Sequence, residues 1–289
     1  MRVHVVGVGK MGLPMARNLR RGGHALSVSD TDADRLRLAR EADLQVLDAA
    51  QGISSADMVL SSLPHDAALL AVGDQVTRHA RRNAIYIDTS TVSLHASAEV
   101  AKRCAQVGVR HLRATVSGNN HMAEAAQLTV MTSGPRDAFE TALPLLQLLG
   151  PSQFWLGEGE QARLMKLVVN LMIAQTSAML AEALALGSKG GLGWKDMFAV
   201  LAASAVGSPI LKAKAVQLAE RDFTPTFTVE QMLKDLGLIL EAGAHAHVPL
   251  PQTSATLQLM HAAVAQGFGQ EDYAAIIKAV ESASGLDRQ

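Results

Sequence analysis

The chain has 289 residues, enough for about two domains of ordinary size. Hydrophobic residues make up 48% and charged residues 18%, a balance that excludes a disordered chain. The net charge is -1 and aromatic residues are only 3%, so we predict no nucleic-acid partner. The single cysteine, Cys104, excludes an intrachain disulfide and a Cys-rich metal site. These numbers predict a globular, cytoplasmic protein.

The first half of the chain alternates between short β-branched runs and helical stretches. The runs predicted to be strands are 3–6, 25–28, 58–61, 85–87, 109–112 and 128–131, and the clearest helical stretches are 11–21, 34–42, 67–80 and 94–106. The runs lack polar alternation, which is typical of strands covered by helices on both faces. The pattern predicts an α/β fold, a Rossmann-type doubly wound parallel sheet.

The second half of the chain has a different sequence pattern. From about residue 160 there are long stretches rich in Ala, Leu and Met, interrupted by Gly and Pro, and no strand pattern. We therefore predict a dinucleotide-binding domain over 1–160 and an all-α substrate and oligomerisation domain over 161–289, with a long connecting helix at about 161–189. Residues 167–187 are apolar and long enough to cross a membrane, but include Asn170 and Glu182. We expect a fully buried helix and no membrane partner.

The strongest local motif is Gly7-Val8-Gly9-Lys10-Met11-Gly12, which follows the strand RVHVV and opens a helix. This is the context that a dinucleotide-binding GxGxxG motif requires. Gly7 permits the tight turn, Gly9 lets the backbone approach a pyrophosphate, and Gly12 lets helix and strand pack closely. Free N–H groups at the helix N-terminus would then bind the phosphates.

Asp30 ends the second predicted strand, eighteen residues after Gly12. A carboxylate there accepts hydrogen bonds from both ribose hydroxyls and repels a 2′-phosphate, which favours NAD over NADP. The alternative is that Asp30 only caps the helix that begins near Asp32.

Lys166 and Asn170 lie four residues apart near the start of the apolar helix, and so share one helical face. Polar groups on such a helix are costly unless they have partners. Partial desolvation lowers the pKa of a lysine toward neutrality, as a general acid/base needs. The alternative is a solvated lysine at the helix start.

Several motifs, in order and nearly end to end, resemble the β-hydroxyacid dehydrogenase family, which includes 3-hydroxyisobutyrate dehydrogenases and tartronate semialdehyde reductases. They are VVGVGKMGLPMARNL, SSLP, IDTSTVS, TVSG, GEGEQARLMKLVVN, and KDLGLILEAG followed by VPLP. The resemblance implies hydride transfer between NAD(H) and a small 3-hydroxy acid or its semialdehyde. It also implies a 6-phosphogluconate dehydrogenase-like C-terminal domain and a homodimer or homotetramer.

The resemblance implies a role for each matching residue. Lys166 matches the catalytic lysine. The implied substrate-binding residues are Ser117, Gly118, Asn119, Asn170 and Lys234. The implied cofactor-binding residues are Gly7, Gly9, Lys10, Met11, Gly12, Asp30, Leu63, Pro64, Thr91 and Lys234. For Lys234, the alternative is an exposed ion pair with Asp235.

Two departures from the family pattern leave other functions open. The substrate loop, usually close to DAPVSGG, reads RATVSGN from Arg113 to Asn119. We expect Asn119 to replace a glycine because Asn tolerates positive φ. The KLVVN sequence resembles the glyoxylate and succinic semialdehyde reductase branch, whose members resemble NADP users. A non-catalytic dinucleotide-binding sensor is a further alternative.

We predict no metal site. His245 and His247 form an H-x-H pair, but we expect no set of further ligands to complete a metal site around them. We interpret them as residues at a helix end.

Overall fold

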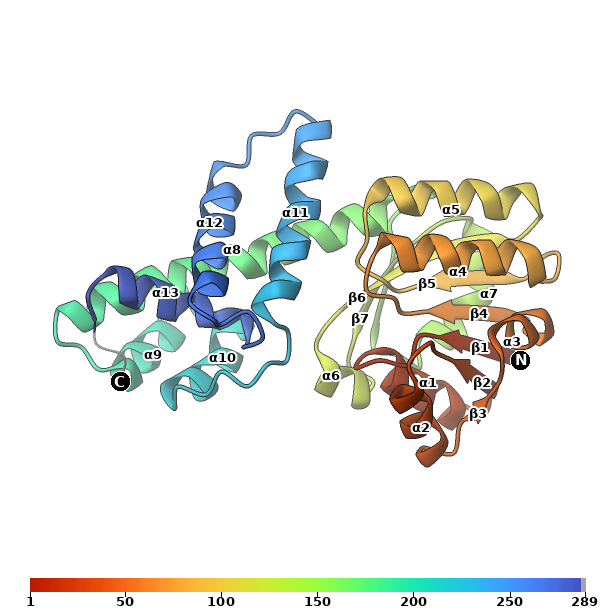
Figure 1. The fold of residues 1–289 in the computed structure, drawn as a ribbon, viewed down its shortest axis with the longest axis horizontal. Coiled ribbons are helices and arrows are strands. Elements are labelled where there is room, and N and C mark those ends of the chain that lie inside the picture. Colours follow the sequence, from red (N-terminus) through yellow and green to blue (C-terminus); the bar gives the residue numbers. More distant parts are fainter. Residues whose placement is uncertain (287–289) are drawn as a thin grey trace. The chain divides into compact units, whose positions relative to one another are not determined.

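A computed structural model describes residues 1–286 of the chain. The chain divides into two compact units, Met1–Lys166 and Leu167–Gln289. The first unit contains every strand of the described residues, and the second is helical (Figure 1). The predicted α/β class, with a Rossmann-type sheet followed by an all-α region, is confirmed.

The first unit is built on one eight-stranded sheet with the order β3-β2-β1-β4-β5-β6-β7-β8. Its strands are β1 (Arg2–Val6), β2 (Ala25–Ser29), β3 (Gln45–Val46), β4 (Met58–Ser61), β5 (Ile85–Asp88), β6 (Arg110–Ser117), β7 (Thr129–Ser133) and β8 (Ser152–Trp155). The order reverses beside β1, which is the switch point where doubly wound sheets bind their ligands. The carboxyl ends of β1, β2, β4 and β5 therefore form the edge at which a dinucleotide is expected.

Helices cover both faces of this sheet (Figure 1). They are α1 (Gly12–Arg21), α2 (Ala33–Glu41), α3 (Ala49–Ser55), α4 (Asp66–His79), α5 (Leu94–Gln106), α6 (Asn120–Glu124) and α7 (Arg136–Leu146). One core joins strand residues such as Val5 and Ile87 to Leu19 of α1 and Phe139 of α7. A second core packs α3, α4 and α5 against the other face. Both faces of the sheet are buried, as predicted from strand sequences in which polar and apolar residues do not alternate.

The sheet differs from the predicted parallel arrangement at β6 and β7, which pair antiparallel. Only the short helix α6 separates these two strands, and a parallel crossover needs a longer connection. The predicted strand 109–112 is also too short, because β6 continues to Ser117. Its later residues Ala114 and Val116 are buried, and Val116 pairs with Val130 of β7. Most of the segment predicted to be the substrate loop, from Arg113 to Ser117, therefore lies within a strand.

The second unit consists of helices. They are most of α8 (Gln161–Lys189), then α9 (Trp194–Ala203), α10 (Pro209–Ala219), α11 (Val229–His245), α12 (Pro251–Ala265), the 3-10 turn η1 (Tyr273–Ala275) and α13 (Ile276–Ala283). Their apolar faces share one core, which includes Leu184, Leu236 and Ile277. A capping box fixes the start of α11, because Thr228 accepts from the N–H of Gln231 while the Gln231 amide oxygen accepts from the N–H of Thr228.

Helix α8 is the only helix of the described residues that is long and apolar enough to cross a membrane. It was expected to be fully buried, but 39% of its most apolar stretch is buried. Val168, Met172, Met179 and Leu186 are 45% to 77% exposed. They are spaced by four, seven and seven residues, so they form one stripe along the helix, which we call the α8 stripe.

Candidate active site

The glycine-rich loop between β1 and α1 is tight at two of its glycines and open at the third. Gly7 has a φ of +87°, and a Cβ there would lie 2.4 Å from the carbonyl oxygen of Ser62. A Cβ on Gly12 would lie 1.9 Å from the carbonyl oxygen of Gly7. A Cβ on Gly9 would meet nothing within 4 Å. The loop is therefore closed against the protein at Gly7 and Gly12 and leaves room for a ligand over Gly9.

The N-terminus of α1 has features that suit an anion. Met11 occupies the N-cap position, no side chain caps the helix, and its first turn carries no acidic residue. The first N–H groups of a helix need partners that the helix itself does not supply, and the helix dipole favours negative charge there. Lys10 is exposed beside this turn. These residues fit the pyrophosphate of a dinucleotide.

Asp30 follows β2 and is tied to the glycine-rich loop. One of its carboxylate oxygens accepts from the N–H of Val8 at 2.7 Å and the other from the N–H of Asp32 at 3.0 Å. It does not cap α2, because Asp32 occupies that position and accepts from the N–H groups of Asp34 and Arg35. A carboxylate oxygen can accept more than one hydrogen bond, so both oxygens retain capacity for ribose hydroxyls.

The loops after β4 and β5 lie beside the glycine-rich loop on the same edge of the sheet, since β1 pairs with β4 and β4 with β5. Ser90 joins them by accepting from the N–H of Leu63 through its hydroxyl at 2.8 Å. Pro64 is exposed and Thr91 is half-buried. The structure therefore brings three of the predicted cofactor contacts, Leu63, Pro64 and Thr91, to the edge that holds the glycine-rich loop.

The predicted substrate loop takes its shape from Gly118 rather than Asn119. Gly118 has a φ of +136°, and a Cβ there would lie 2.7 Å from the Leu128 side chain. Asn119 has a φ of -99°, so the expectation that it replaces a glycine through positive φ is wrong. Its side chain instead caps α6 by accepting from the N–H of Met122 at 3.0 Å. Ser117, the last residue of β6, lies directly before this turn.

Lys166 lies near the start of α8 and is half-buried. Asn170, one turn further along the same helix, is buried and donates through its amide nitrogen to the carboxylate of Asp235 on α11. The other oxygen of Asp235 lies 3.0 Å from the Lys234 ammonium. The side chain of Lys234 is 37% exposed and that of Asp235 is 1% exposed, so the predicted Lys234–Asp235 pair exists, with its lysine at the surface and its carboxylate buried.

Sequence reasoning overlooked two groups of polar residues near these positions. Asp235 was interpreted only as a neighbour of Lys234, although its helical spacing from the apolar residues Met232, Leu236 and Ile239 was a usable signal that it is buried. The buried ion pair between Arg163 and Asp88 was not anticipated. Its two members are 75 residues apart in the chain, and only the fold brings them together.

Burial changes the titration of several polar side chains within the sheet. His4 hydrogen-bonds Ser27 at 2.9 Å and Ser29 at 3.0 Å, and its burial lowers its pKa to about 4. Burial, with Arg113 and Arg163 nearby, lowers the pKa of His111 well below its usual value. Burial also raises the pKa of Tyr86, whose ring centroid lies 5.1 Å from that of His111. These histidines are neutral in the folded chain at pH 7.

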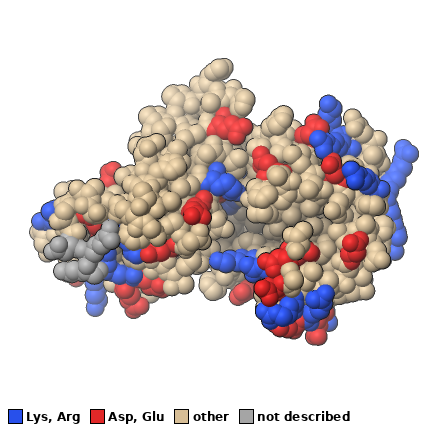
Figure 2. Space-filling model, in the orientation of Figure 1, with Lys and Arg blue, Asp and Glu red and all other residues tan. Residues whose placement is uncertain are grey.

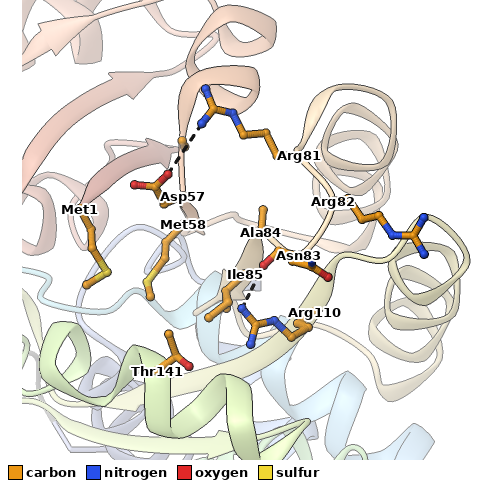
Figure 3. Close-up of a pocket in the computed structure, with 11 residues that line it drawn as sticks. Met1, Asp57, Met58, Arg81, Arg82, Asn83, Ala84, Ile85, Arg110 and Thr141 are labelled. Atoms are coloured by element: carbon orange, nitrogen blue, oxygen red, sulfur yellow. Dashed lines mark hydrogen bonds and ion pairs between the residues drawn. The ribbon is translucent and has the colours of Figure 1, made fainter.

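A cavity of about 210 Å³ lies at the opposite edge of the sheet (Figure 3). Met58 and Ile85, which line it, are the first residues of β4 and β5. Two of its charged residues, Asp57 and Arg110, already have partners. The Asp57 carboxylate accepts from Arg2 at 2.8 Å, and Arg110 donates to Asp137 at 3.0 Å and to the carbonyl of Asn83. The cavity therefore has no relation to the glycine-rich loop.

The part of the chain that the structure describes shows no cluster of metal ligands, and the face in Figure 2 shows no patch of a single charge. Among residues 1–286, no three His, Cys, Asp or Glu side chains are grouped so as to hold a metal ion. Acidic and basic side chains are intermixed on the face that Figure 2 shows. That face carries no patch of a single sign that would attract an anionic substrate.

Comparison with known proteins agrees with this arrangement. Residues 2–157 match the NAD binding domain of 6-phosphogluconate dehydrogenase, and residues 160–280 match a family described as NAD-binding of NADP-dependent 3-hydroxyisobutyrate dehydrogenase. The chain is 32% identical to 2-(hydroxymethyl)glutarate dehydrogenase of Eubacterium barkeri over 99% of its own length and 97% of the relative. It is 30% identical to glyoxylate/succinic semialdehyde reductase 2 of Arabidopsis thaliana, over 98% and 80% of the two chains.

Among solved structures, the chain resembles 3-hydroxyisobutyrate dehydrogenase of Mycobacterium tuberculosis, studied with L-serine. The TM-score is 0.89 and the identity 27%, over 96% of this chain and 98% of that one. Because the relatives that match end to end are dehydrogenases and reductases, the non-catalytic sensor alternative is set aside. The chain belongs to the β-hydroxyacid dehydrogenase family and is a nicotinamide dinucleotide-dependent oxidoreductase.

Proposed function

We propose that the enzyme transfers a hydride between NAD(H) and a small 3-hydroxy acid, or its semialdehyde, of the 3-hydroxyisobutyrate type. One observation carries the proposal. The first unit brings the open glycine-rich loop, Asp30 and the start of α8 with Lys166 to the carboxyl edge of one sheet. This is the edge at which doubly wound sheets bind dinucleotides.

In this proposal Lys166 is the general base in oxidation and the general acid in reduction. A bound nicotinamide supplies the hydride acceptor or donor at its C4. The Lys166 amine takes the hydroxyl proton as the alcohol is oxidised and returns it when the carbonyl is reduced. Asn170, one helical turn away and fixed by Asp235, holds the hydroxyl-bearing end of the substrate.

The substrate carboxylate is assigned to the turn after β6 and to a lysine. Backbone N–H groups at Ser117 and Gly118, with Asn119 holding the turn through its cap, bind the carboxylate. Lys234 supplies a positive charge to substrate and cofactor. In this proposal residues 1–160 bind the dinucleotide and contribute the turn that binds the substrate carboxylate, and residues 161–289 supply Lys166, Asn170, Lys234 and the contacts between subunits.

Lys166→Ala tests the assigned chemistry. We expect kcat to fall by about 10²- to 10⁴-fold because the proton acceptor is lost. NADH binding, followed by its fluorescence, is expected to stay within about twofold, a change well below 1.4 kcal/mol, since the glycine-rich loop and Asp30 are untouched. Unchanged turnover in the variant would reject the role of Lys166.

NAD, rather than NADP, is the proposed cofactor because of Asp30. Its carboxylate is fixed by the N–H groups of Val8 and Asp32 and would lie against a 2′-phosphate. We expect kcat/KM for NAD to exceed that for NADP by at least about tenfold, which corresponds to 1.4 kcal/mol. Asp30→Ser is expected to narrow that ratio, and equal use of both cofactors by the wild type would contradict the assignment.

A glyoxylate and succinic semialdehyde reductase is the second candidate. The KLVVN sequence around Asn170 and the Arabidopsis thaliana relative favour it. Oxidation of 3-hydroxyisobutyrate and L-serine is compared with reduction of glyoxylate, succinic semialdehyde and tartronate semialdehyde, with each cofactor. A higher kcat/KM for glyoxylate or succinic semialdehyde with NADPH than for 3-hydroxyisobutyrate with NAD would select this candidate.

The α8 stripe supports a homodimer or homotetramer. An apolar stripe on a long helix is stabilised by burial against another apolar surface, and a second copy of the chain supplies one. The same burial suits a cytoplasmic enzyme better than a membrane-spanning one. Light scattering at two protein concentrations is expected to give a multiple of 30.5 kDa. Met172→Glu together with Met179→Glu is expected to lower that mass, and a wild-type mass of one chain would reject the proposal.

A further inference from the structure

Four buried polar side chains lie in register across the sheet of the first unit. Ser61 of β4 pairs with Asp88 of β5, Asp88 with Arg113 of β6, and Arg113 with Ser133 of β7. All four are at most 6% exposed. Residues in register point to the same face of a sheet. We call this set the polar row.

The first turn of α8 is attached to the polar row by a buried arginine. Arg163, which is 1% exposed, donates to the Asp88 carboxylate and to the carbonyl oxygen of Ser90. Its Nε donates to the hydroxyl of Ser97 on α5 at 3.1 Å. The guanidinium therefore has partners on two sides and holds one orientation.

Further contacts hold the residues just before Arg163. Glu160 pairs with Arg113 of the polar row. The hydroxyl of Ser133 donates to the carbonyl of Gly159 at 2.7 Å and accepts from the N–H of Ala162 at 3.1 Å. The turn is thus fixed to three neighbouring strands, β5, β6 and β7.

The same network reaches the loops assigned to the cofactor. The Ser90 hydroxyl donates to Asp88 at 2.7 Å and accepts from the N–H of Leu63 at 2.8 Å. Ser61 also donates to Asp88. Asp88 therefore connects the loops after β4 and β5 with Arg163, three residues before Lys166.

A buried ion pair is not an efficient way to stabilise a fold, because the desolvation of both charges offsets their attraction. Its use here is better explained by geometry, since a guanidinium with fixed partners specifies position. We propose that Arg163, through Asp88, is a positioning residue that sets Lys166 against the loops after β4 and β5, which are assigned to the cofactor. The proposal rests on the proposed role of Lys166.

The experiment compares Arg163→Met and Arg163→Lys with wild type in NAD-dependent oxidation of 3-hydroxyisobutyrate. The substrate carries hydrogen or deuterium on its hydroxyl-bearing carbon. We expect Arg163→Met to lower kcat by about 10- to 100-fold, the cost of a misplacement near 1 Å. The deuterium isotope effect on kcat is expected to rise, because hydride transfer becomes more rate-limiting, while NADH binding changes little. Arg163→Lys is expected to recover part of kcat.

A matched control is Arg221→Met in the second unit. Arg221 forms a two-point ion pair with Glu281, at 2.9 Å and 2.8 Å, but contacts none of the proposed site residues. It is expected to lower the melting temperature without changing the isotope effect. Should Arg163→Met fail to fold, Ser97→Ala removes a single bond to Arg163 and is expected to raise the isotope effect less.

The outcomes distinguish a failure of the inference about Arg163 from a failure of the proposed function. If Lys166→Ala is inactive but Arg163→Met, Arg163→Lys and Ser97→Ala keep the wild-type isotope effect, Arg163 has only a structural role and the inference is overturned. If Lys166→Ala keeps full turnover, or wild type does not oxidise 3-hydroxyisobutyrate, the proposed function fails first and the inference with it. A raised isotope effect that Arg163→Lys partly restores supports the positioning role.

Discussion

The two edges of the eight-stranded sheet differ in whether their polar groups already have hydrogen-bonding partners within the protein. At the carboxyl edge, Gly9 faces open space and the N-terminus of α1 has no side-chain cap. At the amino edge there is a cavity of about 210 Å³, but Asp57 and Arg110, which line it, already have partners within the protein (Figure 3). Unsatisfied backbone groups, rather than empty volume, mark the edge that suits a ligand.

Gly12→Ala is expected to have the largest effect, because it acts on the closed part of the carboxyl edge. Its Cβ would lie 1.9 Å from the Gly7 carbonyl oxygen, so the loop or α1 must move. We expect a loss of at least about 3 kcal/mol in the free energy of unfolding. Dinucleotide binding should be lost with it. Urea titration measures the free energy of unfolding, and NADH fluorescence measures dinucleotide binding. If the variant has the wild-type value of each, the loop is not closed as described.

Acid should destabilise the whole sheet, and so both of its edges, because His4 lies in the middle of β1. Its pKa is lowered from 6.5 to about 4 by burial, so between these values the unfolded chain binds a proton that the folded chain does not. The free energy of unfolding should fall as the pH falls from 6.5 to 4, by about 3 kcal/mol from this residue. His111 is expected to add to the loss.

His4→Gln provides the control for this prediction. The amide keeps a polar side chain near Ser27 and Ser29 but does not titrate. Urea titrations at pH 7, 5.5 and 4.5 are expected to show a smaller acid-dependent loss in the variant than in wild type. An equal loss in both proteins would mean that His4 contributes nothing to acid sensitivity.

The features of the carboxyl edge that depend on local sequence were predicted well. The GxGxxG loop and the extent of α8 follow from spacing and composition, which act within a few turns of the chain. The cap formed by Asn119 and the antiparallel pairing of β6 with β7 depend on the short connection through α6. The polar row depends on strand register. The sequence of a parallel strand buried on both faces lacks the alternation of polar and apolar residues that would reveal this register.

Gly9→Ala should separate ligand binding from stability at the carboxyl edge. A Cβ there meets nothing within 4 Å, so the free energy of unfolding without cofactor is expected to stay within about 0.5 kcal/mol. The added methyl group would occupy the space that a pyrophosphate approaches. We expect NADH to bind at least about tenfold more weakly, a change of 1.4 kcal/mol. Unchanged affinity would place the pyrophosphate elsewhere.

Arg110→Met, at the amino edge, should have the smallest effect. Arg110 is 30% exposed and its partner Asp137 69%, and exposed ion pairs contribute about 0–1 kcal/mol. We expect a small loss of stability, with kcat, KM and NADH affinity unchanged, because the residue lies at the opposite ends of the strands from Gly9 and Asp30. A clear loss of NADH affinity in this variant would mean that the two edges are coupled through the sheet. In that case the cavity at the amino edge would have to be treated as part of the functional site.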